Sequence, residues 1–326
     1  MQPARFDLLG IGNAIVDVIA AVQPDFLSRH GMSPGAMALI DAAAATALTD
    51  ALPGARQFGG GSAANTCTVA AALGARVAYA GKVAADALGQ AFERDIAASG
   101  VHFANAPLHG GAPTARCVVL VTPDGQRTMN TFLGASVALA DTDIDESLVA
   151  DSAVTYLEGY LFDPPAAQAA FRRAAACAHR AGRQVALSLS DAFCVDRHRD
   201  AFRALVRGEV DILFANEAEI CSLYRCDRFE DAAAQARGEV ALAALTRGEA
   251  GSMLFRGAEA VTVEAAPAQV LDTTGAGDAY AAGVLAALAA GHGLADAGRV
   301  GSVAAAAVIA QYGARPPEGQ RALAGL

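Results

Sequence analysis

The sequence predicts an α/β fold in which a mostly parallel sheet is covered by helices on both faces. Short apolar runs of strand length alternate along the chain with longer segments of helical period, and the short runs are apolar on both sides. The expected strands, in chain order, are residues 6–9, 77–80, 154–157, 185–189, 212–215 and 241–246. The expected helices are residues 86–99, 165–181, 200–206, 231–237 and 275–290.

Two hairpins are also expected. The Pro-Asp-Gly sequence at residues 123–125 supplies turn geometry between two β-rich runs, residues 114–121 and 127–132. A second hairpin, formed by residues 251–255 and 260–263, would close the antiparallel side of the main sheet.

A small second sheet is predicted beside the core. Residues 15–22 and 37–40 are expected to be extended, and the polar, Gly and Pro residues between them predict a connection without a helix. Together with the first hairpin they would form four strands over one edge of the core, contributed by about residues 14–41 and 112–133. A lid and an ordinary decorated edge are both compatible with this pattern.

Composition excludes several classes of function. The 326 residues carry a net charge of -10, which opposes binding to a nucleic-acid backbone. No apolar run reaches the roughly 18 residues that span a bilayer, and the first residues do not resemble a signal peptide. The six cysteines lack disulfide or zinc spacing, which predicts reduced thiols in a cytoplasmic protein. With no repeat or linker, residues 1–326 are expected to form a single domain.

The most informative segment is residues 271–283, where a Gly-rich turn leads into an Ala-rich helix. Thr273 and Thr274 can cap this helix, and Gly275 and Gly277 allow unusual backbone angles. The N–H groups at its start would converge on one spot, where the helix dipole favours negative charge. This pattern predicts an anion hole formed by Gly275, Ala276, Gly277 and Asp278.

Asp278 places a carboxylate inside that hole. A carboxylate would repel a simply bound phosphate, but it suits a site where a substrate hydroxyl loses its proton as a phosphoryl group arrives. The alternative is an acid that only complements the helix dipole in the first turn.

Two further features predict contacts with a polyhydroxylated ligand. The three glycines at 59–61 could let a flat ligand lie on the backbone, and Asn65 offers both a donor and an acceptor, although a flexible loop before a helix is the alternative. Asp17 lies among apolar residues, where a carboxylate needs a partner. A sugar diol and a structural backbone N–H are both candidates for that partner.

Other motifs leave alternatives open. Residues 216–219, Asn-Glu-Ala-Glu, open a helix after a strand, so their acids could complement the helix dipole or hold Mg²⁺ through water. Arg127 follows the hairpin turn and could be solvated or could reach a transferred phosphate. No GxxxxGK[ST] occurs, and the Gly10-Ile11-Gly12 stretch lacks a third glycine and a following helical period, which excludes P-loop and dinucleotide-binding folds.

Together these motifs resemble the PfkB, or ribokinase-like, family of carbohydrate and nucleoside kinases over essentially the full chain. Residues 59–65 are similar to the first signature of the family, residues 272–283 to the second, and residues 216–219 to its Asn-x-x-Glu element. Within the family, the residues most similar to the adenosine kinase branch, particularly its bacterial members, are Gly12, Asn13, Asp17, Met37, 131–136 and 158–160.

The resemblance implies a three-layer α/β/α core with a small β lid, and ATP-dependent phosphorylation of the 5′-hydroxyl of a purine nucleoside, adenosine first of all. By matching position, Asp278 would be the base, Gly275, Ala276 and Gly277 the anion hole, and Arg127 a group near the transferred phosphoryl. Residues that would bind the ribose are Asn13, Asp17, Gly60, Gly61 and Asn65. Apolar residues that could sandwich a purine, or only pack, are Met37, Phe132, Tyr160 and Phe162.

The resemblance also implies the cofactors ATP and Mg²⁺. The residues implied to border the ATP phosphates are Asn216, Thr246, Arg247, Gly248 and Gly251, and Asn216 and Glu219 would hold Mg²⁺ through water. Asp272 and Thr274 match positions where relatives bind a monovalent cation, usually potassium. The chain could be a monomer or a homodimer.

Two other functions remain open on the sequence. One is a PfkB-type sugar kinase for ribose, fructose or a related ketose, since the same polar residues would serve any furanose. The other is a nucleotide-binding regulator without catalysis, which would have no need of a carboxylate inside an anion site.

Overall fold

The structure is a computed structural model that describes residues 3–316 and 319–325. Its main element is a 9-stranded sheet in the order β14-β13-β12-β11-β10-β9-β1-β5-β6. The strands from β12 to β6 along this order are parallel, and β13 and β14 form the expected antiparallel hairpin at one side. Their bounds are β1 Phe6–Ile11, β5 Val77–Ala80, β6 His102–Phe103, β9 Ser152–Glu158, β10 Gln184–Ser188, β11 Ile212–Asn216, β12 Leu242–Thr246, β13 Ser252–Arg256 and β14 Glu259–Val263.

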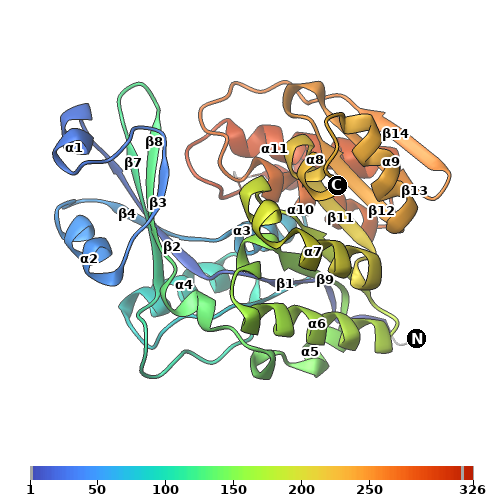
Figure 1. The fold of residues 1–326 in the computed structure, drawn as a ribbon, viewed down its shortest axis with the longest axis horizontal. Coiled ribbons are helices and arrows are strands. Elements are labelled where there is room, and N and C mark those ends of the chain that lie inside the picture. Colours follow the sequence, from blue (N-terminus) through green and yellow to red (C-terminus); the bar gives the residue numbers. More distant parts are fainter. Residues whose placement is uncertain (1–2, 317–318, 326) are drawn as a thin grey trace.

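Helices cover both faces of this sheet and give three layers (Figure 1). Leu8 and Leu9 of β1 illustrate why, because consecutive side chains of a strand point to opposite faces and these two belong to separate buried clusters. The Leu8 face is covered by α3 Ser62–Ala72, α4 Ala87–Ala98, α10 Ala276–Ala289, α11 Leu294–Ile309 and α12 Gln320–Ala324. The Leu9 face is covered by α5 Glu146–Ala150, α6 Pro165–Arg180, α7 Ala192–Glu209, α8 Glu217–Tyr224 and α9 Phe229–Glu239. The predicted three-layer α/β fold is confirmed.

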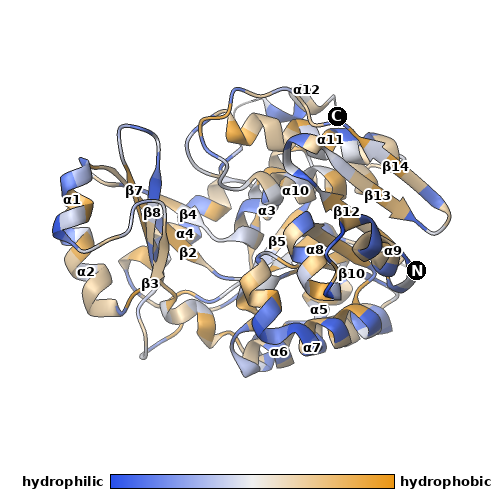
Figure 2. Ribbon diagram, turned by 45° about the horizontal axis from the view of Figure 1, so that its top comes forward, coloured by the Kyte–Doolittle hydropathy of each residue, from blue (hydrophilic) through white to orange (hydrophobic). Residues whose placement is uncertain are grey.

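The helices on the Leu9 face are amphipathic. In Figure 2, α6 and α7 alternate hydrophilic and hydrophobic bands, as expected of helices with one side on the sheet and the other in solvent. The prediction of a helix over residues 200–206 was too short, because α7 begins at Ala192 with Asp191 as its N-cap. A kink at His198 interrupts the helical period within α7, which hid its first half from the sequence pattern.

A 5-stranded second sheet stands to one side of the core, with α1 and α2 on its far side (Figure 1). Its order is β3-β8-β7-β2-β4. The bounds are β2 Ile15–Ala21, β3 Met37–Leu39, β4 Arg56–Gly60, β7 Ala115–Val121 and β8 Arg127–Phe132, and those of the helices are α1 Pro24–Arg29 and α2 Ala42–Asp50. Its outer face packs on these helices through a buried cluster of its own, which includes Val18, Leu27, Leu48, Val118 and Leu120.

The small sheet differs from the prediction in two respects. Four strands were expected and none of them around the three glycines, but Arg56–Gly60 pairs with β2 as a fifth strand. The connection before residue 37 was expected to lack a helix, but it contains α1, which starts at Pro24 and buries only Leu27. A six-residue helix with one buried side chain shows no helical period in the sequence.

The remaining elements are short 3-10 helices, and among the described residues no helix is long and apolar enough to cross a membrane. The 3-10 helices are η1 Gly134–Ala138, η2 Asp141–Asp143, η3 Gly159–Phe162 and η4 Gly248–Ala250. The parallel strands β1, β9, β10, β11 and β12 end at the same edge of the sheet. Ligands of open α/β sheets bind outside the carboxyl ends of the strands, so this edge is where the site is expected.

Candidate active site

Asp278 lies where the N-termini of α3 and α10 meet. Its Oδ1 accepts a hydrogen bond from Ser62 Oγ at 2.6 Å, and its Oδ2 accepts one from Asn65 Nδ2 at 3.1 Å. Burial raises the pKa of Asp278, while the hydrogen bonds from Ser62 and Asn65 oppose that rise. The carboxylate is thereby held in one orientation, and its raised pKa makes it a better proton acceptor than an ordinary aspartate.

The backbone at the start of α10 agrees in part with the predicted anion hole. Gly275 is the N-cap with φ +76, which favours glycine, whereas Gly277 does not have a positive φ. Neither Thr273 nor Thr274 caps the helix through its side chain, and the Ala276 N–H donates to the Thr273 carbonyl at 3.2 Å. That N–H is therefore not free for a ligand, contrary to the prediction.

The N–H groups of Gly275, Gly277 and Asp278 have no hydrogen-bond acceptor within the described residues. Space is open beside the Cα of Gly277, since a Cβ built there would have no neighbour within 4 Å. Three unsatisfied donors, a helix N-terminus and open space make this a place where an anion can approach the backbone.

Asp17 lies on the inner face of the small sheet, in the middle of β2. No described residue donates a hydrogen bond to its half-buried carboxylate, and a Cβ on Gly60 would overlap it, so Gly60 is required there. Burial raises the pKa of Asp17 to about 6; positively charged Arg315 and Arg127 oppose this rise, and Asp278 and Asp272 add to it. The structure therefore brings Asp17, Arg127 and Asp278 to one site.

Glu158, at the end of β9, binds the residues that follow β1 and the start of α3. Its Oε1 accepts from Asn13 Nδ2 at 2.7 Å, and its Oε2 accepts from the N–H groups of Ala63 at 2.8 Å and Asn13 at 3.3 Å. A Cβ on Gly12 would overlap the same carboxylate. Burial raises the pKa of Glu158 to about 7. Glu158 entered the sequence prediction only through the family resemblance, although an acid at the end of a largely buried strand is itself a signal of a site.

Arg127 reaches from β8 of the small sheet to the loop before α10. Its guanidinium forms an ion pair with Asp272 and donates to Thr274 Oγ1. The Asp272 carboxylate also accepts from the N–H of Thr274 at 3.0 Å and from the N–H of Gly313 at 2.7 Å. Arg127 thus joins the small sheet to the loop before α10, beside the free N–H groups.

Asn216 and Glu219 form a capping box at the start of α8. The Glu219 carboxylate accepts from the Asn216 backbone N–H at 3.0 Å and from its Nδ2 at 2.6 Å, and Asn216 Oδ1 accepts from the Glu219 N–H at 2.9 Å. Burial raises the pKa of Glu219 to about 7, and negative charge on Asp191 and Asp278 adds to the rise. Desolvation raises the pKa of the Tyr160 hydroxyl, and the charges of the same acids add to the rise, although 47% of the residue is exposed.

The loop after β12 lies next to Asn216, because Thr246 pairs with Asn216 in the sheet. Gly248 and Gly251 both have positive φ, and the Arg247 N–H donates to the Gly251 carbonyl at 2.8 Å. The Arg247 guanidinium lies over the Phe229 ring, 4.5 Å from its centroid, and pairs with Glu217. The loop therefore lies beside the start of α8, and the Arg247 side chain contacts α8 and α9.

The four apolar residues predicted around a purine are in different environments. Met37 and Tyr160 are exposed, by 56% and 47%. Phe162 is fully buried and stacks on Phe202 with a centroid distance of 4.2 Å, so it is a core residue and not a ligand contact. Phe132 of β8 lies opposite Arg116 of β7 in the strand register, and the Arg116 guanidinium donates to Thr46 of α2.

Strand alternation therefore places Phe132 on the α2 side of the small sheet, away from Asp17. The structure gives no support for Phe132 as a substrate contact. Met129, two residues from Arg127, lies on the inner face instead and pairs with Met37. Counting by twos from Arg127 could have predicted this.

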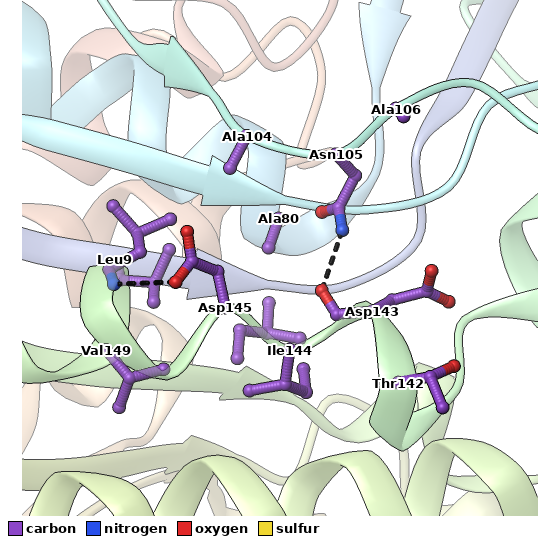
Figure 3. Close-up of a pocket in the computed structure, with 12 residues that line it drawn as sticks. Leu9, Ala80, Ala104, Asn105, Ala106, Thr142, Asp143, Ile144, Asp145 and Val149 are labelled. Atoms are coloured by element: carbon purple, nitrogen blue, oxygen red, sulfur yellow. Dashed lines mark hydrogen bonds between the residues drawn. The ribbon is translucent and has the colours of Figure 1, made fainter.

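A separate hollow of about 210 Å³ lies under the ends of β1 and β5, lined by Asn105, Asp143 and Ile144 among others (Figure 3). Asn105 donates to the Asp143 carbonyl at 2.9 Å, and Lys82 pairs with the Asp143 carboxylate. None of the predicted site residues lines this hollow.

A family model for pfkB family carbohydrate kinases matches residues 35–320. The chain belongs to the pfkB family. Its members transfer phosphoryl groups to hydroxyl groups, so this pfkB protein is a kinase that uses ATP. The resemblance deduced from the sequence is confirmed.

Solved structures and curated relatives place this pfkB kinase among nucleoside and sugar kinases. The adenosine kinase from Sinorhizobium meliloti is 49% identical, with a TM-score of 0.91 and 99% of both chains covered. A probable sugar kinase protein from Rhizobium etli is 45% identical, with a TM-score of 0.91, 99% of this chain and 98% of that one covered. A cytidine kinase from Thermococcus kodakarensis is 28% identical over 78% of this chain and 88% of its own length.

Proposed function

We propose that this pfkB kinase transfers the terminal phosphoryl group of ATP to the 5′-hydroxyl of a purine nucleoside, adenosine first of all, with AMP as product. The observation that carries the proposal is the pair of carboxylates, Asp278 and Asp17, at one site. Asp278 is oriented by Ser62 and Asn65, beside free backbone donors. Asp17 has no hydrogen-bond donor within the described residues.

Each carboxylate has a distinct part in the proposed reaction. Asp17 accepts hydrogen bonds from the ribose diol, which supplies the donors that its carboxylate lacks. Asp278 accepts the proton of the 5′-hydroxyl as that oxygen bonds to phosphorus and the bond from phosphorus to the departing ADP oxygen breaks. The free N–H groups of Gly275, Gly277 and Asp278 stabilise negative charge on the transferred group.

Arg127 is proposed to support the same step from the small sheet, close to the free N–H groups through its contact with Thr274. We also propose that the small sheet acts as a lid, which excludes water and so prevents hydrolysis of ATP.

The residues present fit a magnesium ion. Negative charge on Asp191 and Asp278 acts on Glu219, which forms no ion pair with a basic side chain within the described residues, and the charged groups that shift the pKa of Tyr160 are all acidic. Oxygen donors and excess negative charge are what Mg²⁺ prefers, and Asn216 and Glu219 would hold it through water. When bound, Mg²⁺ supplies charge neutralisation between the phosphates and these acids.

The residues present do not fit a potassium ion at Asp272 and Thr274. The Asp272 carboxylate already accepts two backbone N–H groups and pairs with Arg127, which supplies the positive charge. The Ile309 carbonyl nearby accepts from the N–H groups of Leu271 and Asp272.

An apolar row on the inner face of the small sheet favours a nucleoside over a free sugar. Register pairs Ile19 with Val119, Val119 with Met129, and Met129 with Met37, across four strands. Ile19 lies two residues from Asp17 on the same strand, so the row adjoins the proposed ribose contact. A purine has flat apolar faces to cover this row, whereas a free sugar does not.

The test is ADP release with Mg-ATP and a series of acceptors: adenosine, inosine, guanosine, cytidine, ribose and fructose. We expect the highest kcat/KM with adenosine. Strong turnover with a free sugar and none with nucleosides would instead assign a sugar kinase. Binding of ATP with no ADP release for any acceptor would assign a regulator.

A further inference from the structure

The C-terminal segment of residues 313–315 touches both halves of the proposed site. The Gly313 N–H donates to Asp272 at 2.7 Å, and Ala314 packs so closely on Gly275 that a Cβ there would overlap it. The Arg315 carbonyl accepts a hydrogen bond from Gln311 Nε2, which fixes the segment against the end of α11. Arg315 therefore projects from a segment that is held in place.

The Arg315 guanidinium reaches the other half of the site through α4. It forms an ion pair with Asp95, and the same Asp95 oxygen accepts the Gly59 N–H at 2.9 Å. A Cβ on Gly59 would overlap both the guanidinium and the carboxylate, so the glycine is required for this approach. The Gly59 N–H of β4 is thereby bound to α4. Gly59 comes one residue before Gly60 and two residues before Gly61, the N-cap of α3.

Arg315 also leaves hydrogen-bonding capacity unused. Its side chain is 20% exposed, yet its Nε and Nη1 are buried and have no acceptor within the described residues. Asp17 also lacks a hydrogen-bond donor within the described residues, but it lies toward Gly60, on the opposite face of β4 from Arg315, which lies toward Gly59. Of the two arginines whose charge acts on Asp17, Arg315 has the larger effect and Arg127 the smaller.

We propose that Arg315 is a positioning residue of the substrate site, which ties β4 to α4 through Asp95 and places a positive charge that keeps Asp17 a charged acceptor for the ribose diol. The proposal rests on the proposed function, because it takes Asp17 as the diol acceptor. Arg315 belongs to none of the sequence motifs.

Charged side chains around Asp17 shift its pKa in both directions. Asp17 has a pKa raised to about 6 by burial, and positive Arg315 and Arg127 lower it while negative Asp278 and Asp272 raise it. Cys117 on β7 also faces Asp17, and its pKa is raised. Removing the positive charge of Arg315 therefore raises the pKa of Asp17 further. As the pH falls, Asp17 is then protonated sooner, and nucleoside binding is lost at a higher pH than in the wild type.

The test compares R315M, R315K and D95N with the wild type, and with R173M as a matched arginine replacement on the outer surface of α6. Nucleoside kcat/KM and KM are measured from about pH 5 to pH 9. For R315M we expect the acidic limb of kcat/KM to move up by about one pH unit, so that KM rises about tenfold below pH 6 and little above pH 8. R315K keeps the charge and should keep the limb in place, as should R173M.

D95N removes the ion-pair partner of Arg315 and leaves the positive charge of Arg315 in place. The acidic limb of kcat/KM for D95N should therefore stay where it is in the wild type or move to lower pH. A rise in KM for R315M that is equal at every pH would make Arg315 merely structural and overturn the proposal. An unchanged KM at every pH would overturn it too.

A readout without substrate separates this proposal from the proposed function. The side-chain carboxyl carbon of Asp17, assigned with D17N, is titrated by NMR in wild type and R315M. An upward shift of its midpoint in R315M supports the electrostatic effect even if no nucleoside is phosphorylated, in which case the proposed function alone fails. A midpoint that does not move overturns the proposal.

Discussion

Replacing Asp278 by asparagine tests the proposed proton acceptor most directly. The amide has nearly the shape of the carboxylate, and its oxygen can still accept the 2.6 Å hydrogen bond from Ser62 Oγ. On the other side, the Asn65 amide donor would then face a second amide donor in place of Oδ2. The substitution therefore removes the base and leaves the surrounding architecture almost unchanged.

The size of the effect follows from these contacts. Loss of a positioned general base lowers kcat by roughly 10² to 10⁴, equivalent to about 3 to 5 kcal/mol in the barrier. The unpaired Asn65 donor costs about 1 to 3 kcal/mol of stability, which lowers the unfolding free energy but not the turnover of folded molecules. Nucleoside KM should change little, because the diol contacts belong to Asp17.

The assay is ADP release coupled to NADH oxidation, with adenosine and Mg-ATP at saturation and the folded fraction checked by thermal melting. Ser62→Ala is the matched control, because it removes one hydrogen bond to the same carboxylate and keeps the base. We expect this control to lose no more than about tenfold in kcat, equivalent to a single hydrogen bond of about 1.4 kcal/mol. An Asp278→Asn enzyme within tenfold of wild type would refute the reasoning.

Three other outcomes are expected. Glu158 and Glu219 both have a pKa near 7 against an ordinary 4.5, so the folded state holds protons that the unfolded state has lost, and the free energy of unfolding should fall as pH rises from about 4.5 to 7. Glu158→Gln removes one of these titrations, and urea unfolding at a series of pH values should give a flatter profile for it; an unaltered profile would contradict the assigned cause. Gly277→Ala should raise the unfolding free energy by about 0.5 to 1 kcal/mol, because helix α10 gains a better helix former in open space, while kcat falls as the methyl group obstructs the anion; unchanged kcat would place the phosphoryl group elsewhere. Exchange of potassium for choline should leave kcat unchanged, because Arg127 already pairs with Asp272, and clear activation by potassium would show that this pair opens.

Local patterns predicted the parts of the fold that local interactions determine. The strand at 77–80 was predicted with the bounds that the structure has, since its four residues are all buried. Asn216 and Glu219 are three residues apart, and their sequence pattern correctly placed them at a helix start. By contrast, no strand was predicted at β4, because Gly59 and Gly60 have low strand propensity; their lack of a Cβ is needed for the side chains that approach them.

The site itself depends on contacts that no local pattern encodes. Ser62 and Asp278 are 216 residues apart, and Arg315 and Asp95 are 220 apart. The sequence could identify Asp278 and Asn65 as separate candidates, but only the packing of α3 against α10 shows that one donates to the other. A residue such as Arg315, outside any motif, becomes visible only through its buried contacts.

The arrangement of the small sheet favours a lid over a decorated edge. Its five strands are hydrogen-bonded to one another and its outer face has its own apolar cluster, so it can move as one body. It carries Asp17 and Arg127, whereas Asp278 belongs to the core, and glycines with positive φ, Gly61 and Gly134, lie where it joins the core. A movement at these joints would change the separation of Asp17 from Asp278 while Ser62 and Asn65, which start α3, keep their hold on the base. The diol contact, Asp17, and the proton acceptor, Asp278, thus belong to different bodies. Substrate binding between them would itself bring the small sheet onto the core, and this closure would exclude water before the phosphoryl group is transferred.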